Sequence, residues 1–231
     1  MTDLKGKIIV IEGTDGSGKQ TQTKLLKENL ERQGYKVFTT SFPKYDSPSS
    51  AAVQMYLGGE IRENPRDISP KAAATFYAVD RYITYKTLIE PIYKEKDAVI
   101  LFDRYVASNI IHQGAKLIEE NPASEEELKA FIAWLDNFEH GDMGIPKADI
   151  TIFLNVPIET TIKLRENRAN KITGGEKQDI HESDNSHLIN ASIAGNMAGR
   201  LLNWNIIECV EDGKMRTIED IGNEILKEIT K

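Results

Sequence analysis

The chain has a single cysteine, no long apolar run and no excess of basic residues, and each absence narrows the class of protein. One cysteine, Cys209, excludes an internal disulfide and is typical of a reducing compartment. No apolar run approaches the roughly 18 residues that a membrane helix needs, and the first residues lack a signal-peptide pattern. Aspartate and glutamate (36) outnumber lysine and arginine (29), and this net charge of −7 argues against a nonspecific nucleic-acid binder. We therefore expect a cytoplasmic protein that spans no membrane and binds no nucleic acid.

The rest of the sequence has the pattern of an α/β protein. The 231 residues suit one large domain or two small ones, and no internal repeat or low-complexity linker divides them, so we expect a single domain over 1–231. Long helical stretches separate five apolar runs that read as buried strands: Ile8–Ile11, Lys36–Thr40, Ala98–Phe102, Ile150–Leu154 and Ile206–Val210. This alternation predicts a five-stranded parallel sheet flanked by helices on both faces. Ligands on such sheets bind beyond the carboxyl ends of the strands, so residues directly after the strands are the first functional candidates.

A glycine-rich segment lies between the first predicted strand and an amphipathic helical stretch. It reads Gly13-Thr14-Asp15-Gly16-Ser17-Gly18-Lys19-Gln20-Thr21. Strand, glycine turn and helix in this order make a P-loop, whose backbone N–H groups and helix N-terminus bind phosphates while the lysine reaches the outer phosphates. The segment therefore predicts binding of ATP or GTP. Gln20 stands where a hydroxyl normally holds magnesium, so either carboxylates and phosphates hold the metal or the loop is degenerate.

Two further segments carry side chains suited to a second ligand. Asp103 and Arg104 directly follow the third predicted strand, where the carboxylate can act on magnesium and the planar guanidinium on a phosphate. Tyr77 and Arg81 lie four residues apart in a helical stretch, so they share a face and could stack on and hydrogen-bond a base. The plainer alternative for Asp103 and Arg104 is a solvated ion pair at the end of a strand. For Tyr77 and Arg81 it is a tyrosine in the core and an arginine in solvent.

The segment from about 165 to 186 reads as a lid. It carries charges of both signs around Gly174-Gly175, and the apolar helical spacing stops within it and resumes only at Leu188. A surface loop without function is the alternative.

Together these motifs resemble those of the thymidylate kinase family over nearly the whole chain. The resemblance rests on the order and spacing of the P-loop, Phe42-Pro43, Tyr77-Ala78-Val79-Asp80-Arg81, Asp103-Arg104-Tyr105-Val106-Ala107-Ser108-Asn109, Pro146-Lys147-Ala148-Asp149 and Asp179-Ile180-His181-Glu182. That family transfers the γ-phosphate of ATP to dTMP with magnesium, which gives dTDP for dTTP biosynthesis. The resemblance implies the same reaction, ATP and magnesium here.

The resemblance also implies roles for the matching residues. The loop from Gly13 to Thr21 would hold ATP, with Lys19 on its phosphates. The dTMP site would comprise Asp15 near the 3′-hydroxyl, Phe42 and Pro43 beside the nucleoside, Tyr77 stacked on thymine, Arg81 and Asn109 at the base edge, Arg104 on the phosphate, and Tyr105 and Ser108 of the same motif. His112 stands where many relatives have an aromatic against the deoxyribose, which puts the rejection of ribonucleotides in doubt. The metal candidates are Asp15, Asp103 and Glu182.

A catalytic arginine is also expected, because phosphoryl transfer needs positive charge over the moving group. Some family members carry this arginine inside the P-loop, but Gly16 and Ser17 provide none here. We therefore expect the lid to supply it, from Arg165 or Arg168, with Lys171 as a helper. Their spacing of three would group them on one face of a helical start to the lid.

Three alternatives remain open. One is a P-loop kinase for another deoxynucleotide or for a deoxynucleoside, although two cations, Arg81 and Arg104, favour an acceptor that already carries phosphate. A GTPase would need Asn-Lys-x-Asp, which Asn170-Lys171 does not complete. A non-catalytic nucleotide binder rests on Gln20 alone.

Relatives are homodimers, which implies a dimer here, and the sequence permits one through apolar helices around Ile110, Ile111, Phe131 and Trp134.

Overall fold

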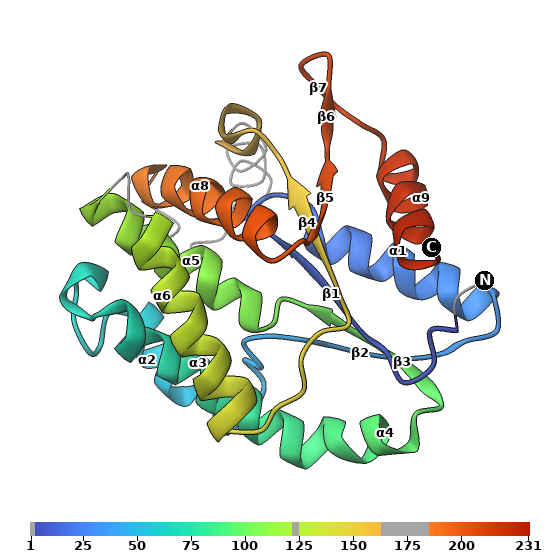
Figure 1. Ribbon diagram of the computed structural model, residues 1–231, viewed down its shortest axis with the longest axis horizontal. Helices are drawn as coiled ribbons and strands as arrows, with labels where there is room; N and C mark the ends of the chain where they lie inside the picture. Colours follow the sequence, from blue (N-terminus) through green and yellow to red (C-terminus); the bar gives the residue numbers. More distant parts are fainter. Residues whose placement is uncertain (1–2, 122–124, 163–184) are drawn as a thin grey trace.

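A parallel five-stranded sheet forms the centre of the computed structural model (Figure 1), which describes residues 3–121, 125–162 and 185–231. The strands are β1 (Ile8–Gly13), β2 (Lys36–Ser41), β3 (Ala98–Asp103), β4 (Ile150–Asn155) and β5 (Asn205–Glu208). Their spatial order is β2-β3-β1-β4-β5. All pairs are parallel, and Ile11 of β1 lies opposite Asp103 of β3. The predicted fold class is confirmed.

The central strands are mainly apolar because helices cover both of their faces, and their charged residues, Glu12 and Asp103, lie near the carboxyl ends. Ile8 and Val10 belong to one hydrophobic cluster, whereas Ile9 and Ile11 belong to the cluster on the opposite face. The prediction that all five strands are buried is wrong at the two edges of the sheet. No residue of β2 is fully buried, and β5 buries only Ile207, because an edge strand has a single neighbour.

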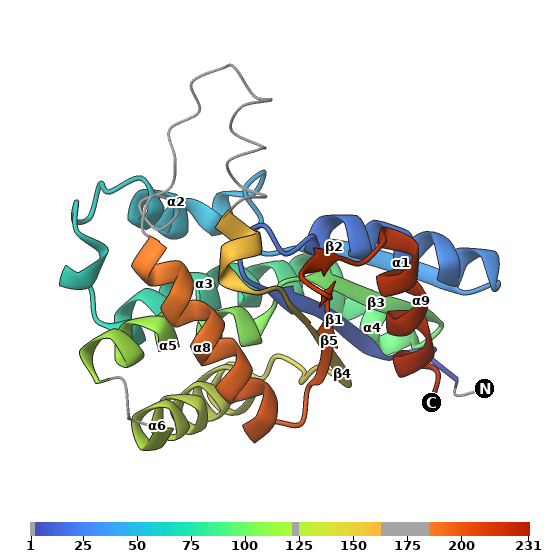
Figure 2. The ribbon, with the colours of Figure 1, turned by 90° about the horizontal axis from the view of Figure 1, so that it is seen from above.

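Two layers of helices enclose the sheet, as Figures 1 and 2 show. Helices α1 (Lys19–Arg32) and α9 (Ile218–Ile229) cover one face. The opposite layer contains α3 (Pro70–Thr84), α5 (Val106–Glu120), α6 (Glu125–Leu135) and α8 (Asn185–Leu201), and α8 packs along α5. The described residues also contain the shorter α2 (Ala51–Leu57) and α4 (Glu90–Glu95) and a helical stretch over 158–162. They include 3₁₀ turns at Pro48–Ser50 and Pro65–Asp67 and π-helical turns at Tyr85–Ile89 and Asp136–Asp142 as well.

A small hairpin follows the sheet and was not predicted. Val210, expected at the end of the last strand, belongs instead to β6 (Val210–Glu211), which pairs with β7 (Lys214–Met215). The signal is present in the sequence, because Asp212 and Gly213 both adopt positive φ, and an Asp-Gly pair favours a two-residue hairpin.

The interior contains several side chains expected at the surface or near it. Ile110, Ile111 and Phe131 are buried in the hydrophobic clusters, so these three side chains cannot themselves form a dimer contact, whereas Trp134 is only partly buried. Cys209 is buried and burial raises the pKa of its thiol to about 12, so the group is an inert part of the core. Among the described residues no helix is long and apolar enough to cross a membrane.

Candidate active site

The P-loop turns from β1 into α1 through two glycines that no other residue could replace without strain. A Cβ on Gly13 would lie 2.5 Å from Ser17 Oγ, and Gly18, the N-cap of α1, has a φ of 89°. Lys19 is the first residue of α1, and its buried ammonium donates a hydrogen bond to Thr14 O across the loop, with a Nζ to O distance of 2.8 Å. Gln20 and Thr21 lie exposed on the first turn of α1.

Lys19 is a buried cation close to other charges. Burial and the nearby positive charge of Arg104 lower the pKa of Lys19 to about 8, against the opposing effect of Asp15. Its ammonium nitrogen lies 4.0 Å from Asp15 Oδ1. A phosphate in the loop would supply the anion that this ammonium lacks at hydrogen-bond distance.

Arg104 faces the P-loop from the end of β3. Its backbone has a φ of 69°, and its N–H donates to Ile11 O with an N to O distance of 3.1 Å. The guanidinium donates through Nη2 to Asp15 Oδ1, and its Nη1 lies 3.0 Å from His112 Nε2. Burial opposes ionisation of Asp15, but the charges of Arg104 and Lys19 hold its pKa well below the usual range. Asp15 is therefore a carboxylate that fixes the guanidinium beside the loop.

His112 holds the other side of this guanidinium. Burial and the charge of Arg104 place the pKa of His112 well below its ordinary value, so the ring is neutral at neutral pH. A neutral ring can accept the Arg104 hydrogen bond at Nε2. The ring also stacks on His187 of α8, with the two centroids 5.8 Å apart and an interplanar angle of 15°.

A cavity of about 280 Å³ joins these groups to the side chains expected around a nucleoside. Its lining includes all the predicted acceptor-site residues: Asp15, Phe42, Pro43, Tyr77, Arg81, Arg104, Tyr105, Ser108, Asn109 and His112. The structure therefore brings together segments that lie far apart in the sequence. Arg165, Arg168, Lys171 and Glu182, with most of the predicted lid, lie outside the described residues.

Arg81 is a structural cation in this cavity wall. It is fully buried, and its Nε and Nη2 donate to the two carboxylate oxygens of Glu139, each at 2.6 Å. Asn109 Nδ2 donates to the same carboxylate at 3.1 Å and to Ala74 O at 3.1 Å. Glu139 therefore neutralises the charge of Arg81 inside this wall, which weakens the argument that two cations, Arg81 and Arg104, favour an acceptor that already carries phosphate.

Gln113 lines the same cavity and was missed in the sequence. Its side chain is 0% exposed, and within the described part of the chain neither Oε1 nor Nε2 has a hydrogen-bond partner. A buried amide without partners costs free energy, so this side chain is suited to a polar ligand. The missed signal is its spacing, because Gln113 lies four residues after Asn109 and so shares its face of α5.

The groups available for a metal are carboxylates and a loop hydroxyl. Asp103 Oδ1 is buried at the end of β3 without a hydrogen-bond partner, and Ser17 Oγ is buried and unpartnered inside the loop, both judged within the described residues. In the same ranges no three histidine, cysteine, aspartate or glutamate side chains converge as a complete metal site. This set fits magnesium held partly by phosphates and water, since magnesium normally keeps several non-protein ligands.

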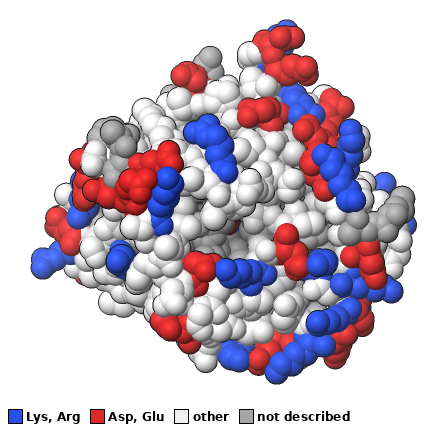
Figure 3. Space-filling model, viewed as in Figure 1, with Lys and Arg blue, Asp and Glu red and all other residues white. Residues whose placement is uncertain are grey.

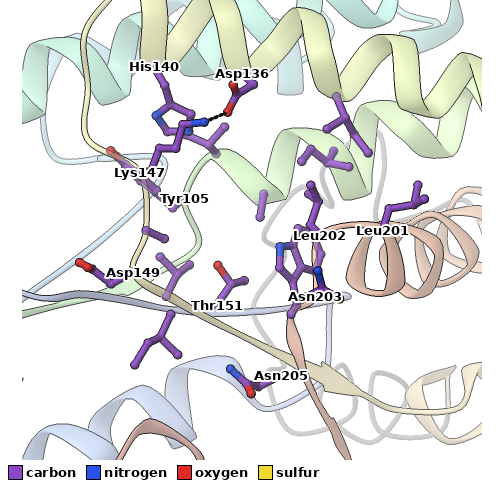
Figure 4. Close-up of a pocket in the computed structure, with 18 of the residues that line it drawn as sticks. Tyr105, Asp136, His140, Lys147, Asp149, Thr151, Leu201, Leu202, Asn203 and Asn205 are labelled. Atoms are coloured by element: carbon purple, nitrogen blue, oxygen red, sulfur yellow. Dashed lines mark ion pairs between the residues drawn. The ribbon is translucent and has the colours of Figure 1, made fainter. Parts of the chain in front are cut away.

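A second and larger cavity, of about 630 Å³, opens on the face shown in Figure 3. It lies between α6, the end of α8 and the first residues of β4 and β5, and Figure 4 shows Lys147 paired with Asp136 at its rim. Tyr105 lines both cavities, but the other predicted acceptor-site residues do not line this one. The candidate active site is therefore the smaller cavity at the carboxyl ends of β1 and β3.

Comparison with known proteins identifies the family of this chain. The family model for thymidylate kinase matches residues 11–192, a span that includes the P-loop and the acceptor cavity. The chain is 34% identical to the thymidylate kinase of Mycobacterium tuberculosis over 77% of this chain and 78% of that protein. It is 32% identical to the probable thymidylate kinase of Pyrococcus abyssi over 72% and 73%, and 30% identical to the thymidylate kinase of Prochlorococcus marinus over 97% and 98%. The chain belongs to the thymidylate kinase family.

Proposed function

We propose that this protein is an ATP-dependent dTMP kinase, which transfers the γ-phosphate of ATP to dTMP and releases dTDP and ADP. The observation that carries the proposal is the cavity beside the P-loop, where the guanidinium of Arg104 lies between Asp15 and His112. The lining of this cavity includes Asp15 of the P-loop together with aromatic and amide side chains suited to a base.

On the donor side, the backbone N–H groups of the segment Gly13–Thr21 and the ammonium of Lys19 bind the phosphates of ATP. Magnesium, when bound, neutralises charge on the phosphate oxygens. Asp103 and Asp15 are the described residues that would hold it, directly or through water, and Glu182 is the third candidate. Gln20 is exposed, so this proposal gives it no part in holding the metal.

On the acceptor side, Arg104 binds the phosphate of dTMP, for which its planar fork is suited. Tyr77 stacks on thymine, while Asn109, Gln113 and Arg81 form the polar wall at the base edge. Phe42 and Pro43 close the nucleoside pocket, and His112 lies beside the sugar. Tyr105 and Ser108 support this wall from the start of α5.

The reaction then needs positioning more than a base. An oxygen of the dTMP phosphate attacks the γ-phosphorus of ATP, the bond from that phosphorus to the bridging oxygen breaks, and ADP leaves. The acceptor phosphate is already ionised, so no residue has to remove a proton. Lys19 and a lid arginine stabilise the charge on the transferred group, and Arg104 holds the attacking phosphate in line.

A coupled assay of ADP release tests the proposal with ATP, magnesium and a panel of dTMP, dUMP, dGMP, ribosyl-TMP and thymidine. We expect fast turnover of dTMP and none of thymidine. The alternative is a P-loop kinase for another deoxynucleotide or a deoxynucleoside, and the neutralised Arg81 is the observation that favours an uncharged acceptor. Turnover of thymidine alone would establish that alternative and remove the proposed role of Arg104.

Replacing Gln113 by leucine should stabilise the empty protein and weaken the acceptor site. Removing an unpartnered buried amide is expected to add about 1 kcal/mol to the free energy of unfolding, which raises Tm by about 2–4 °C. The same change should raise KM for dTMP by about tenfold, because a hydrogen bond to the base is lost. Thermal unfolding and steady-state kinetics measure both effects. Gln33→Leu, at an exposed residue after α1, is the matched control. Lower stability with unchanged KM would contradict the assignment.

Arg168→Ala should lower kcat by at least about 100-fold with little change in dTMP binding, because the lid arginine acts on the transition state. Arg165→Ala is the companion variant, since the sequence leaves either arginine as the catalytic one. Near-normal kcat in both variants, measured at saturating ATP and dTMP, would rule out a lid arginine.

We propose the remaining properties on broader grounds. The chain acts as one domain over 1–231 with a lid at about 165–186. It acts in the cytoplasm, because a single cysteine, which cannot form an internal disulfide, is typical of a reducing compartment. It forms a homodimer, which the half-exposed apolar side chains of Val79, Ile83 and Leu88 on α3 and the following turn support. Sedimentation analysis that finds only monomer at micromolar concentration would exclude the dimer.

A further inference from the structure

Glu12 is a buried carboxylate to which neither the family resemblance nor the reaction assigns a role. It lies one residue before the P-loop, at the end of β1, and its side chain is 0% exposed. Charged side chains are seldom fully buried unless partners hold them, because removing an ion from water is unfavourable. The partners of Glu12 therefore indicate what it does.

Both oxygens of Glu12 bind the start of α5. Oε1 accepts the backbone N–H of Tyr105 at 2.8 Å, and Oε2 accepts the hydroxyl of Ser108 at 2.7 Å. Tyr105 is the N-cap residue of α5 but gives no side-chain cap, and the first turn of the helix contains no acidic residue. A carboxylate from β1 thus accepts the N–H of the N-cap residue, as the third helical residue does in a capping box, and supplies the negative charge that favours a helix N-terminus.

The turn held in this way contains Arg104. Its φ of 69° is unfavourable for a residue with a Cβ, so neighbouring contacts must maintain it. Two successive residues of β1 provide them, because Ile11 O accepts the N–H of Arg104 at 3.1 Å and Glu12 accepts the next N–H along the chain. The direction of the Arg104 side chain therefore depends on the strand that also begins the P-loop.

We propose that Glu12 is a positioning residue that fixes Arg104 relative to the P-loop by holding the N-terminus of α5. It touches neither substrate and acts through Tyr105 and Ser108. The inference rests on the proposed function, since it assigns Arg104 to the acceptor phosphate. Asn109, His112 and Gln113 lie on the same helix, α5, and line the acceptor cavity. The carboxylate of Glu12 therefore also fixes the position of these three side chains relative to the P-loop.

Two variants of Glu12 distinguish the effect of its side-chain length from the effect of its negative charge. Glu12→Gln keeps the reach, since its carbonyl oxygen can accept from Tyr105 and its amide can donate to Ser108 Oγ, but it removes the charge. Glu12→Asp keeps the charge and withdraws the carboxylate by one methylene. A displacement of about 1 Å costs about 100-fold in rate, so we expect Glu12→Asp to lower kcat/KM for dTMP by about 100-fold and Glu12→Gln by less than about tenfold.

A double-mutant cycle with Arg104→Ala shows whether the effect passes through the guanidinium. In the Arg104→Ala protein we expect Glu12→Asp to change kcat/KM for dTMP by less than about threefold, because its target is gone. The affinity for ATP without acceptor should stay within about threefold of the parent in every Glu12 variant. Circular dichroism confirms that each variant is folded.

The opposite order of effects, with Glu12→Gln more damaging than Glu12→Asp, would overturn the proposal in favour of a purely electrostatic role. Independent, additive effects of Glu12→Asp and Arg104→Ala would overturn it as well. Failure of the parent enzyme to phosphorylate dTMP would instead refute the proposed function, so the two ideas fail in distinguishable ways. If Glu12→Asp does not fold, Ser108→Ala takes its place in the cycle, with the same requirement that its effect vanish without Arg104.

Discussion

Arg104→Ala is expected to lower kcat/KM for dTMP by about 10³-fold, one of the two largest effects we predict. The guanidinium is fixed by Asp15 and His112 in front of the P-loop, and a charge-assisted, two-pronged contact to a phosphate is among the strongest polar contacts a protein makes. Without it the attacking phosphate is neither neutralised nor held in line. Steady-state kinetics with dTMP as the varied substrate measures the loss.

The size of the loss should depend on the shape of the cation as well as on its charge. Arg104→Lys keeps the charge without the planar fork, so we expect a loss of about 10- to 100-fold, between alanine and the parent. Arg32→Ala, on the exposed last turn of α1, is the matched control and should leave the kinetics unchanged. A loss of less than about tenfold for Arg104→Ala would remove this residue from the acceptor site.

Lys19→Ala is expected to lower kcat by about 10³-fold and to weaken ATP binding. The ammonium is buried inside the loop and bonded to Thr14 O, so a phosphate can recruit it without drawing a flexible side chain from water. The charge over the transferred group, supplied where water is largely excluded, lowers the barrier to transfer. Single-turnover kinetics and calorimetry measure the two effects, and Lys24→Ala, exposed on the same helix, is the control.

The lowered pKa of Lys19 adds a pH dependence of known sign. In the empty protein burial and Arg104 bring this pKa to about 8, so the ammonium loses its proton as the pH rises through that value. ATP binding needs the protonated form, and between about pH 7 and pH 9 the affinity for ATP should therefore fall by about tenfold. An affinity that is flat or rises over this range would show that the lysine stays charged without ATP.

Much of this protein could be predicted from local patterns. The five strands follow from apolar runs between helical stretches, and the order of strand, glycine turn and lysine places the nucleotide loop. The rule that ligands bind beyond the carboxyl ends of parallel strands pointed to the turn after β3, and Asp103 and Arg104 of this turn do line the smaller cavity. These predictions succeed because each depends on residues close together in the chain.

The errors and omissions concern contacts across long sequence separations. Ile110 in α5 and Phe131 in α6 each belong to an apolar helix face that could, from the sequence of that helix alone, lie at the surface. Only the packing of α5, α6 and α8 against one another shows that both side chains are in the core. Arg81 looks like a cation for a ligand until Glu139, 58 positions further along the chain, is found against it. Gln113 looks like any helical polar residue until the cavity beside it is known.

By itself, then, the sequence determined the class of fold, the glycine-rich loop and the family, and it named the side chains that meet in one cavity. The tertiary structure alone decided which of those side chains are free to act, because a buried charge is governed by the partner that folding brings to it. Arg81 is neutralised by Glu139, whereas Arg104 is aimed at the loop by Asp15 and His112, and Glu12 holds the helix that follows it. Periodicity and motif spacing record which residues share a strand or a helix face, but the partner of a buried ion is set by packing between elements distant in the chain.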